Sequence, residues 1–553
     1  MDIRKLNPAI RKILADRGID TDQKAEEYLS PIPQSTYDPF LMKNMDEVCN
    51  RIEKAVKDRE RICIYGDYDV DGVTSTVLLL EFLGYVTDNV TYYIPSRFEE
   101  GYGLNMNACD KMHDDGVSLV ITVDNGCAAK AEVSYIKELG MDVIVTDHHK
   151  IDPDRKPDCL IIDAKQEGET YPYRDLCGCG TAFKIAQALR DRFGIPKKAL
   201  NHCLDLAGIA TVADVVPLTD ENRTLVKYGI DRIKKQERPG INALLGAASV
   251  NPLRVNSYEI AFGIGPRINS AGRLRTADTG VALLSASDPE TASVYAGKLE
   301  ELNRERRAIQ DSIYKDAVDY IDGNCRDDLF IIYENDDAHE GVMGIAAGKL
   351  KEKYNKPVII MASANEPGFL KGTGRSIEGV DIFNLLNAHI ELFERFGGHA
   401  AACGFTISRE NGQNLREILN HDMKRLVDED PDLLKKKIKS DAMITAGDVT
   451  FELAREVDLM EPFGSGNERP VFFIEGLSVI RVFTMGNERQ YRKYICSGSE
   501  SGSIDAVVFD TDIEGYDIVT AGDTLDVMAE VTINSWNGRD SVQLVIREIS
   551  ARY

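Results

Sequence analysis

The stretch Ile62-Cys-Ile-Tyr-Gly-Asp-Tyr-Asp-Val-Asp-Gly72 carries three carboxylates, Asp67, Asp69 and Asp71, directly after an apolar run. The run Ile62–Tyr65 is typical of a buried parallel strand. The flanking glycines permit a sharp turn, and residues 73–82 are predicted to form the helix that follows. Three crowded acids repel one another unless protons or a cation neutralise them, and hard divalent cations take oxygen ligands. The stretch therefore predicts a metal site at a strand's carboxyl end in an α/β sheet.

Two other interpretations fit part of this pattern. An EF-hand calcium loop starts with the same Asp-x-Asp-x-Asp-Gly pattern, but it follows a helix and has Glu at its twelfth position. This chain has Leu78 there, and a strand is predicted before the loop. A solvated acidic turn is the second alternative when the stretch is taken alone.

Length and composition indicate a globular protein of several domains. A chain of 553 residues is too long for one ordinary core, so three or four domains are expected. No segment approaches about 18 uninterrupted apolar residues, and no apolar run follows the first five residues, so neither a membrane span nor a secretory signal is predicted. Eleven scattered cysteines favour a reducing, cytoplasmic location, and Cys177 and Cys179 are interpreted as structural.

The formal net charge of −25 argues against a protein that coats nucleic acid with its whole surface. It leaves open a nucleic-acid enzyme with a local basic channel, because metal ligands and solubility charge account for part of the acid excess.

The first half of the chain alternates predicted strands with predicted helices. After a helical lead-in over residues 1–45, strand-like runs occur at Ile62–Tyr65, Val90–Ile94, Leu119–Val123, Val143–Thr146 and Leu160–Ile162. Helical patterns lie between several of them. This alternation predicts an α/β fold with a doubly wound, mostly parallel sheet over residues 46–235.

The second half is predicted to hold a long helix, a second α/β unit and a β-barrel. Dense charge with helical periodicity over Glu290–Ile321 predicts a long linking helix within residues 236–323. Strands at Leu329–Tyr333 and Val358–Met361, with helices at Val342–Tyr354 and Ile382–Arg395, predict the α/β unit over residues 324–430. Five or six short strands within residues 441–553 predict a small OB-like barrel.

Two more predicted strands of the first unit end in polar residues. Asp124 follows one of them, and Asp147, His148 and His149 follow the next. Taken singly, an acid at a strand end often caps a helix, and a His-His pair is more often polar packing than a ligand pair. Strand carboxyl ends converge on one edge of a doubly wound sheet, and Asp214, in an apolar context, needs a partner if it is buried. Together these residues predict a site for two Mn²⁺ or Mg²⁺ ions.

Four ordered motifs resemble those of the DHH phosphoesterase family: Asp67-Tyr-Asp-Val-Asp-Gly72, Val123-Asp-Asn-Gly126, Asp147-His-His149 and Ala213-Asp-Val-Val-Pro-Leu218. Further stretches resemble the family's linking segment, its DHHA1 domain and the start of an OB domain: Gly265-Pro-Arg-Ile-Asn-Ser-Ala-Gly-Arg273, Gly374-Arg-Ser376 with residues 397–404, and Pro462-Phe-Gly-Ser-Gly-Asn467. The resemblance implies that the three predicted units are a DHH catalytic domain, a DHHA1 domain and an OB-like domain.

The resemblance also implies a role for each residue of the site. One ion would be held by Asp67, Asp69 and Asp124, and a second by Asp71, Asp124, His148 and Asp214, so that Asp124 bridges the two ions. His149 would contact the scissile phosphate, and Asp147 would orient a ligand histidine. Many relatives carry a histidine just upstream of the first motif, where this chain has Tyr65, so the role of Asp67 departs from the family pattern.

Eight further residues are candidate substrate contacts: Arg97, Tyr102, Arg267, Asn269, Arg273, Arg375, Ser376 and His399. The first two suit phosphate contact and base stacking, although a salt bridge of Arg97 with Glu99 or Glu100 is an equal alternative. The next three lie among glycines and suit phosphate contact. The pair at 375 and 376 resembles a terminal-phosphate pocket, with a plain turn as the alternative. For His399 the alternative is a buried structural histidine.

The function that the resemblance implies is degradation of single-stranded DNA from its 5′ end to mononucleotides, in DNA recombination and repair. The expected partners are single-stranded DNA, a helicase and a single-strand-binding protein, and a monomer without membrane association is expected. A DHH phosphodiesterase acting on short RNA or nucleotides is the enzymatic alternative, and the extra C-terminal β domain speaks against it. An inactive single-strand-binding scaffold is an alternative of another class, and the intact acids and histidines speak against it.

Overall fold

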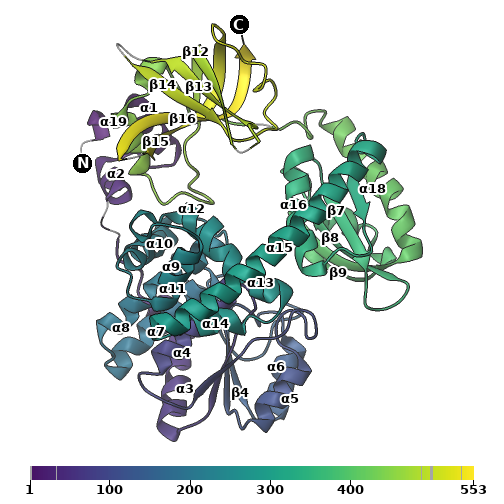
Figure 1. Cartoon of the computed structure of the whole chain (residues 1–553). Helices are drawn as coiled ribbons and strands as arrows, with labels where there is room; N and C mark the ends of the chain where they lie inside the picture. Colours follow the sequence, from purple (N-terminus) through teal and green to yellow (C-terminus); the bar gives the residue numbers. More distant parts are fainter. Residues whose placement is uncertain are drawn as a thin grey trace. The chain divides into compact units, whose positions relative to one another are not determined.

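A computed structural model gives the fold of the chain and describes residues 3–30, 32, 34–436, 438–486, 488–498, 502–536 and 538–552 (Figure 1). The chain divides into two compact units. One holds residues 1–300 and 438–553, and the other holds residues 301–437. Within the described ranges, no helix is both long and apolar enough to cross a membrane.

The first sheet is fully parallel. Its strands are β1 (Ile62–Tyr65), β2 (Val90–Tyr93), β3 (Leu119–Thr122), β4 (Asp142–Thr146) and β5 (Leu160–Ile162), in the spatial order β2-β1-β3-β4-β5. The chain leaves β1 towards β2 and later returns to its other side as β3, so a topological switch point lies between β1 and β3. Ligands bind at such points in open α/β sheets. The predicted doubly wound parallel sheet is confirmed.

Helices cover both faces of this sheet. Residues of four strands, among them Tyr65, Val120 and Val145, form one buried cluster with residues of α5 (Met106–Asp114) and α6 (Lys130–Glu138). Helices α3 (Met45–Asp58), α4 (Val70–Leu83) and α7 (Gly178–Phe193) pack with one another on the other side (Figure 1). Helix α4 begins at Val70, three residues before the predicted start, because Asp69 caps it.

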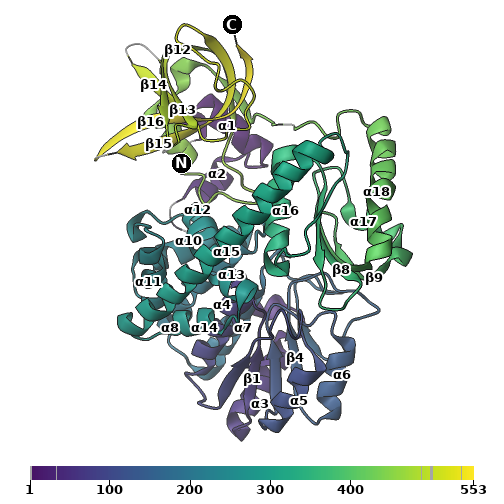
Figure 2. The ribbon, with the colours of Figure 1, turned by 45° about the vertical axis from the view of Figure 1, so that its right-hand side comes forward.

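A group of helices continues the same unit. These are α8 (Lys197–His202), α9 (Leu204–Ala213), α10 (Asp220–Lys234), α11 (Pro239–Ala247), α12 (Ser257–Glu259), a π-helical turn (Ile260–Ile264), α13 (Gly265–Leu274) and α14 (Asp278–Leu284), with short 3₁₀ turns at Pro39–Leu41 and Pro252–Arg254. Helix α15 (Pro289–Asn324) then leads into the second unit as one continuous helix (Figure 2). It confirms the predicted long linking helix.

The second unit holds a mixed sheet. Its strands β6 (Ile331–Glu334), β7 (Val358–Ser363), β8 (Phe369–Arg375), β9 (Phe393–His399) and β10 (Ala402–Ser408) lie in the order β6-β7-β8-β10-β9, and only the pair β6–β7 is parallel. Its other helices are α16 (Glu340–Tyr354), α17 (Ile382–Asn387) and α18 (Arg409–Glu429), with a 3₁₀ turn at Ile390–Leu392 and a buried core between sheet and helices.

The predicted helix Ile382–Arg395 is wrong. Helix α17 ends at Asn387, and Phe393 already begins β9. The rings of Phe393 and Phe396 stack on each other, and Phe393 also meets Phe405 of β10 edge to face. Gly397 and Gly398, which are poor helix formers, pair in register with β10. Cross-strand aromatic packing therefore overrides the apparent helical periodicity.

The C-terminal strands form a closed barrel. They are β11 (Ala442–Ile444), β12 (Phe472–Met485), β13 (Tyr491–Ser497), β14 (Ser503–Val508), β15 (Thr524–Trp536) and β16 (Arg539–Arg552), and the additional pairing of β12 with β15 closes five of them into a ring. Strand β12 changes register between Ile474 and Leu477, around Gly476. The predicted OB-like barrel is confirmed.

The chain's first helices belong to the core of this barrel. Ile10 and Leu14 of α1 (Pro8–Asp16) and Leu29 of α2 (Asp22–Leu29) are buried in one cluster with residues of α19 (Phe451–Asp458) and of the barrel strands. The backbone amide of Asn7, which follows a 3₁₀ turn at Ile3–Lys5, donates to Glu456 at 2.8 Å. Apolar burial thus ties the lead-in to the C-terminal residues.

Candidate metal centre

The three acids of the first motif follow β1 but have different surroundings. Asp69 caps α4, because its carboxylate accepts the backbone amides of Asp71 at 2.9 Å and Gly72 at 3.1 Å. Asp67 is buried, and its Oδ1 has no hydrogen-bond partner among the residues that the structure describes. A buried carboxylate oxygen without a donor is costly, so this oxygen is suited to a cation.

The carboxylate of Asp71 is held by the N-terminus of α7. Its two oxygens accept the backbone amides of Gly178 at 2.6 Å and Cys179 at 2.7 Å. A Cβ atom on Gly178 would lie 2.6 Å from the Cβ of Asp124, so only glycine fits there. Sequence reasoning missed this role and treated Cys177 and Cys179 as structural. A glycine-flanked helix start, which favours anions, was the available signal.

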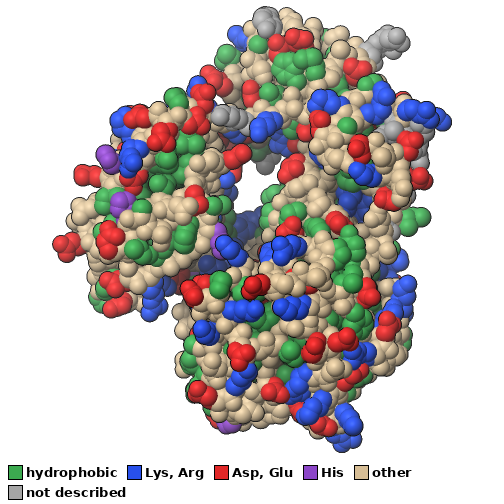
Figure 3. All heavy atoms as spheres, turned by 180° about the vertical axis from the view of Figure 1, so that it is seen from behind, with side chains coloured by type: hydrophobic (Ala, Val, Ile, Leu, Met, Phe, Trp, Pro, Cys, Tyr) green, Lys and Arg blue, Asp and Glu red, His purple; other side chains and the backbone are tan. Residues whose placement is uncertain are grey.

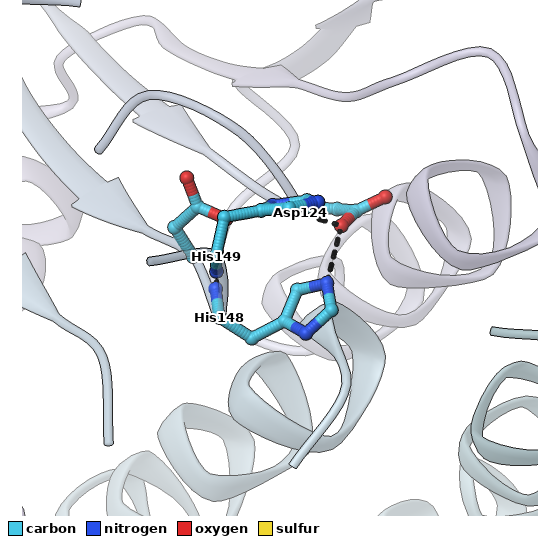
Figure 4. A group of neighbouring side chains, drawn as sticks. Asp124, His148 and His149 are labelled. Carbon is cyan, nitrogen blue, oxygen red and sulfur yellow. Dashed lines mark hydrogen bonds and ion pairs between the residues drawn. The ribbon is translucent and has the colours of Figure 1, made fainter. Parts of the chain in front are cut away.

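Asp124 lies at the centre of the site. Its backbone adopts the left-handed conformation with φ 62°, which Asp tolerates better than most residues. The Nε2 atom of His148 lies 3.1 Å from Asp124 Oδ1, and Nδ1 of His149 lies 4.0 Å from the same oxygen. Figure 4 shows both histidines directed at this one carboxylate.

Asp147 is turned towards the backbone and His149. It accepts the backbone amides of Cys127, His148 and His149 at 2.7–3.2 Å, and Nδ1 of His149 lies 2.7 Å from its Oδ1. Burial opposes the charged forms of this pair, but the mutual hydrogen bond and charge outweigh it. The pKa of Asp147 is therefore lowered, and that of His149 is raised to about 9. Burial and the neighbouring His149 lower the pKa of His148 to about 3, so His148 is neutral, as a metal ligand must be.

Asp214 is supplied by a distant helix. It caps the C-terminal end of α9, and its Oδ2 lies 3.7 Å from Nε2 of His148. The next residue, Val215, is left-handed with φ 60° although its side chain is β-branched and 68% exposed. Such a backbone conformation is strained for valine.

The candidate ligand atoms fall into two neighbouring sets. The atoms of Asp67, Asp69 and Asp124 lie within 4.8 Å of one another, and so do those of Asp71, His148 and Asp214. His148, which contacts Asp124, joins the second set to the first. A further group of Asp124, Asp147, His148 and His149 satisfies the same distance. Its Asp147, however, is already occupied by three backbone amides and His149.

The carboxylates of this site are not balanced by enough positive charge from neighbouring side chains. Burial, followed by repulsion from neighbouring carboxylates, raises the pKa of Asp71 to about 7 and of Asp214 to about 8, and those of Asp67 and Asp124 well above the usual range. Carboxylates with a neutral imidazole suit Mn²⁺ or Mg²⁺. The donor set and the unpartnered oxygen of Asp67 therefore fit divalent cations.

Two candidate substrate residues border the centre. The guanidinium of Arg97 lies over the ring of Tyr68 at 5.3 Å. Glu100 is one of the two alternative salt-bridge partners of Arg97. In the structure its carboxylate instead accepts hydrogen bonds from the Tyr93 hydroxyl and the Ser96 backbone amide. The hydroxyl of Tyr102 donates to the backbone carbonyl of Asp124 at 3.2 Å. Arg97 therefore lies beside the first motif and Tyr102 beside Asp124.

The three candidates on α13 have partners within the protein. Arg267 is buried and donates to Glu300 at 2.6 Å and to the Gly263 carbonyl at 2.7 Å. Asn269 accepts the backbone amide of Val70 at 3.1 Å, which fixes the start of α4. Arg273 is half-buried. Burial raises the pKa of Tyr68, and the positive charge of Arg273 partly opposes that rise. Their DNA contacts stay predictions, and the structure gives Arg267 and Asn269 positioning contacts.

The candidates in the second unit meet at one end of its sheet. Arg375 of β8 and His399 of β9 both pair with Ala402 of β10, one from each side. The hydroxyl of Ser376 donates to the Val380 carbonyl at 2.6 Å. Arg375 is the last residue of β8, and Ser376 follows it just before a turn, so the alternative of a plain turn stays open. His399 is exposed, which contradicts the alternative of a buried structural histidine.

Profiles of known families match three parts of the chain: the N-terminal domain of the DHH family at residues 61–211, the DHHA1 domain at residues 327–425, and the RecJ OB domain at residues 440–548. The fold and the acid–histidine centre are accordingly those of a DHH-family protein.

Comparison with individual proteins narrows the class. The chain is 35% identical to the single-stranded-DNA-specific exonuclease RecJ of Bacillus subtilis, covering 98% of this chain and 68% of that protein. It is 32% identical to the Escherichia coli protein of the same name, covering 99% and 96%. The structure of RecJ from Thermus thermophilus in complex with Mn²⁺ superposes with a TM-score of 0.83 at 25% identity, covering 99% of this chain and 76% of that one. This chain belongs to the RecJ family.

Proposed function

We propose that this chain is a single-stranded-DNA-specific exonuclease that releases mononucleotides from the 5′ end by hydrolysis at two divalent cations. The observation that carries the proposal is a pair of neighbouring ligand sets in a buried, acidic centre, one containing Asp124 and the other contacting Asp124 through His148. The RecJ relatives, which are named single-stranded-DNA-specific exonucleases, supply the substrate class.

The candidate ligands would form two groups, one for each ion. Asp67, Asp69 and Asp124 would hold one, and Asp71, Asp124, His148 and Asp214 the other. When bound, two such ions lower the pKa of water and stabilise the charge of a phosphoryl group in its transition state. The neutral state of His148 and the amides that fix Asp71 keep their ligand atoms available and in place.

His149 is suited to contact the phosphate. Asp147 holds it through a 2.7 Å contact and favours its protonated form, so the ring can donate to a phosphate oxygen and partly offset its charge. Tyr102 and Arg97 beside the centre would contact the strand near the scissile bond. Arg375, Ser376 and His399, at one end of the second sheet, would receive the terminal phosphate.

The surface charge is compatible with a DNA substrate. Figure 3 shows Lys and Arg side chains interspersed with Asp and Glu side chains on the face in view, so the net charge of −25 does not produce a uniformly acidic surface. The barrel would bind the strand beyond the active site, as OB folds do with single strands. The proposal also includes two protein partners, a helicase that supplies single strands and a single-strand-binding protein that covers them. It further includes a monomeric state of this chain.

The test compares four substrates with Mn²⁺: single-stranded DNA labelled at the 5′ end, the same strand labelled at the 3′ end, blunt duplex DNA and a short RNA. We expect labelled mononucleotide at the earliest times only from the 5′-labelled single strand. Mononucleotide appearing first from the 3′-labelled strand would contradict the polarity. Cleavage of the short RNA alone would favour the alternative of a phosphodiesterase for short RNA, and binding without any cleavage would favour the alternative of an inactive scaffold.

A further inference from the structure

The turn Phe463–Asn467, which precedes the barrel strands, packs directly on the segment that follows Asp214. The backbone amide of Leu218 donates to the Ser465 carbonyl at 2.7 Å. A Cβ atom on Gly464 would lie 2.7 Å from Leu218 Cδ1, and one on Gly466 would lie 3.1 Å from Pro217 Cβ. The two segments are therefore in direct contact at both glycines: a side chain on Gly466 would crowd Pro217, and one on Gly464 would displace the Leu218 side chain.

This turn is itself held rigidly. The side chain of Asn467 is almost fully buried; its amide donates to the carbonyls of Met460 and Pro462, and its Oδ1 accepts from Arg17 and Tyr28. The guanidinium of Arg223 on α10 donates to the carbonyls of Met460 and Glu461, and its plane covers the ring of Tyr28. Residues of the lead-in, of α10 and of the C-terminal part thus fix the turn together.

The segment after Asp214 is held from its other side by the catalytic domain. The carbonyl of Pro217 accepts the hydroxyl of Tyr173 and the side-chain amide of Asn222, both at 3.0 Å. Pro217 and Leu218 are therefore held between the turn and the catalytic domain.

This arrangement explains how Val215 keeps its strained backbone. A left-handed β-branched residue persists only where its surroundings over-determine it. The exposed side chain of Val215 does little to hold it, whereas the fixed positions of Pro217 and Leu218 do. If those positions loosened, Val215 would relax to a favourable φ and would displace the adjacent Asp214.

We propose that the turn Phe463–Asn467 is a positioning element for Asp214, so that the C-terminal part of the chain sets the affinity of one of the two cation sites. The proposal rests on the proposed function, in which Asp214 holds the second ion. The turn should affect the affinity of the second cation site and not that of the first. Asp214 directly precedes the segment Val215–Leu218 that the turn holds, whereas the ligands of the first site lie on the sheet edge.

The test measures Mn²⁺ binding without DNA, from the electron paramagnetic resonance signal of free Mn²⁺, for the full chain and four variants. Gly466→Val adds a side chain against Pro217, and Leu218→Ala loosens the same contact from the opposite side. Gly476→Val is the matched control, because Gly476 has nearly the same φ, 67° against 68°, with open space around it. Asp214→Asn reports loss of the second ion directly.

We expect Gly466→Val and Leu218→Ala to keep one ion at wild-type affinity and to weaken the second about tenfold or more, the size seen when supporting residues of a metal site are changed. Gly476→Val should bind both ions as the wild type does. Excess Mn²⁺ should restore the hydrolysis rate of the two contact variants but not that of Asp214→Asn. This split between metal affinity and maximal rate is not expected from a general loss of stability.

Two results would overturn the inference alone: unchanged binding of both ions in the contact variants while Asp214→Asn loses one, or equal weakening of both ions. If Gly466→Val melts well below Gly476→Val, Leu218→Ala decides between these outcomes. Two ions bound at wild-type affinity by Asp214→Asn would overturn the ligand assignment of the proposed function, and the inference with it.

Discussion

Both α/β units have polar residues at strand ends, but the two units differ in how far the protein itself satisfies the charges and hydrogen bonds of these residues. In the parallel sheet, β1, β3 and β4 bring acids and histidines to one edge, where carboxylates repel one another and Asp67 Oδ1 has no donor within the described part of the chain. In the mixed sheet, Arg375 donates to the Gly374 carbonyl and Ser376 to the Val380 carbonyl. The first edge thus needs a cation to complete it, whereas the second is largely satisfied by the protein. Under the proposed function, the first edge would carry out the chemistry and the second would recognise the terminal phosphate.

The strongest test of this contrast is Asp124→Asn. Asparagine tolerates the left-handed backbone as aspartate does, so the change removes the shared charge without adding strain. We expect release of nucleotides from a 5′-labelled strand to fall by roughly 1,000-fold or more, because both ions lose a ligand. Single-turnover kinetics with Mn²⁺ would measure it. Asp158→Asn, in an exposed position of the same domain, is the control, and activity above a tenth of wild type in Asp124→Asn would refute the shared-ligand assignment.

A smaller effect is expected from Gly178→Ala. The added Cβ would meet the Cβ of Asp124 at 2.6 Å and would separate the α7 amides from Asp71. We expect the rate at limiting Mn²⁺ to fall roughly 10- to 100-fold, as for other residues that support metal ligands. Gly180→Ala is the matched control in the same helical turn, because its Cβ would make only ordinary contacts at 3.4 Å. Equal rates for the two variants would show that the α7 N-terminus does not support the site.

Arg375→Ala tests the recognition edge. Loss of one charge-assisted contact should reduce the preference for a 5′-phosphate over a 5′-hydroxyl about tenfold. The change should raise KM for the phosphorylated strand and leave kcat near its wild-type value. Arg409→Ala, which removes an arginine paired with Glu334 in the same unit, is the control. A fall in kcat with unchanged KM would place Arg375 in the chemistry and would remove the contrast between the edges.

The smallest expected effect concerns the protein stripped of metal. The pKa values of Asp71 and Asp214 are about 7 and about 8 in the folded chain and near 3.8 when unfolded. At these two carboxyls the folded state therefore binds more protons between about pH 4 and pH 8, so their contribution to stability falls as the pH rises through that window. In a chelator, we expect melting a few degrees lower at pH 8 than at pH 6, with Mn²⁺ reversing the loss. Asp214→Asn should show a shallower fall and Arg375→Ala an unchanged one; identical slopes in wild type and Asp214→Asn would contradict the assignment.

The sequence located the residues of the first edge because each follows an apolar run that forms a parallel strand. Asp67, Asp124 and Asp147 could be placed in this way, and Asp214 was noticeable as an acid in apolar surroundings. The amides of Gly178 and Cys179 could not, because backbone donors have no side-chain signature. Burial alternates along β8 and β10, but glycines occupy several of their positions and weaken the alternation of side chains in the sequence, so Arg375 and His399 were predicted without the sheet that aligns them. The pairing of Arg267 with Glu300 depends on tertiary packing between two helices.

The burial of α1 and α2 in the barrel core has a consequence for synthesis in the cell. Asn7 and its partner Glu456 are 449 positions apart, so the first helices leave the ribosome long before their binding surface exists. At about 5–20 residues per second, they would wait roughly 20–90 s for the barrel strands. During that interval the apolar faces around Ile10 and Leu14 are exposed, and chaperone binding to the nascent chain should be concentrated there until the last strands are made.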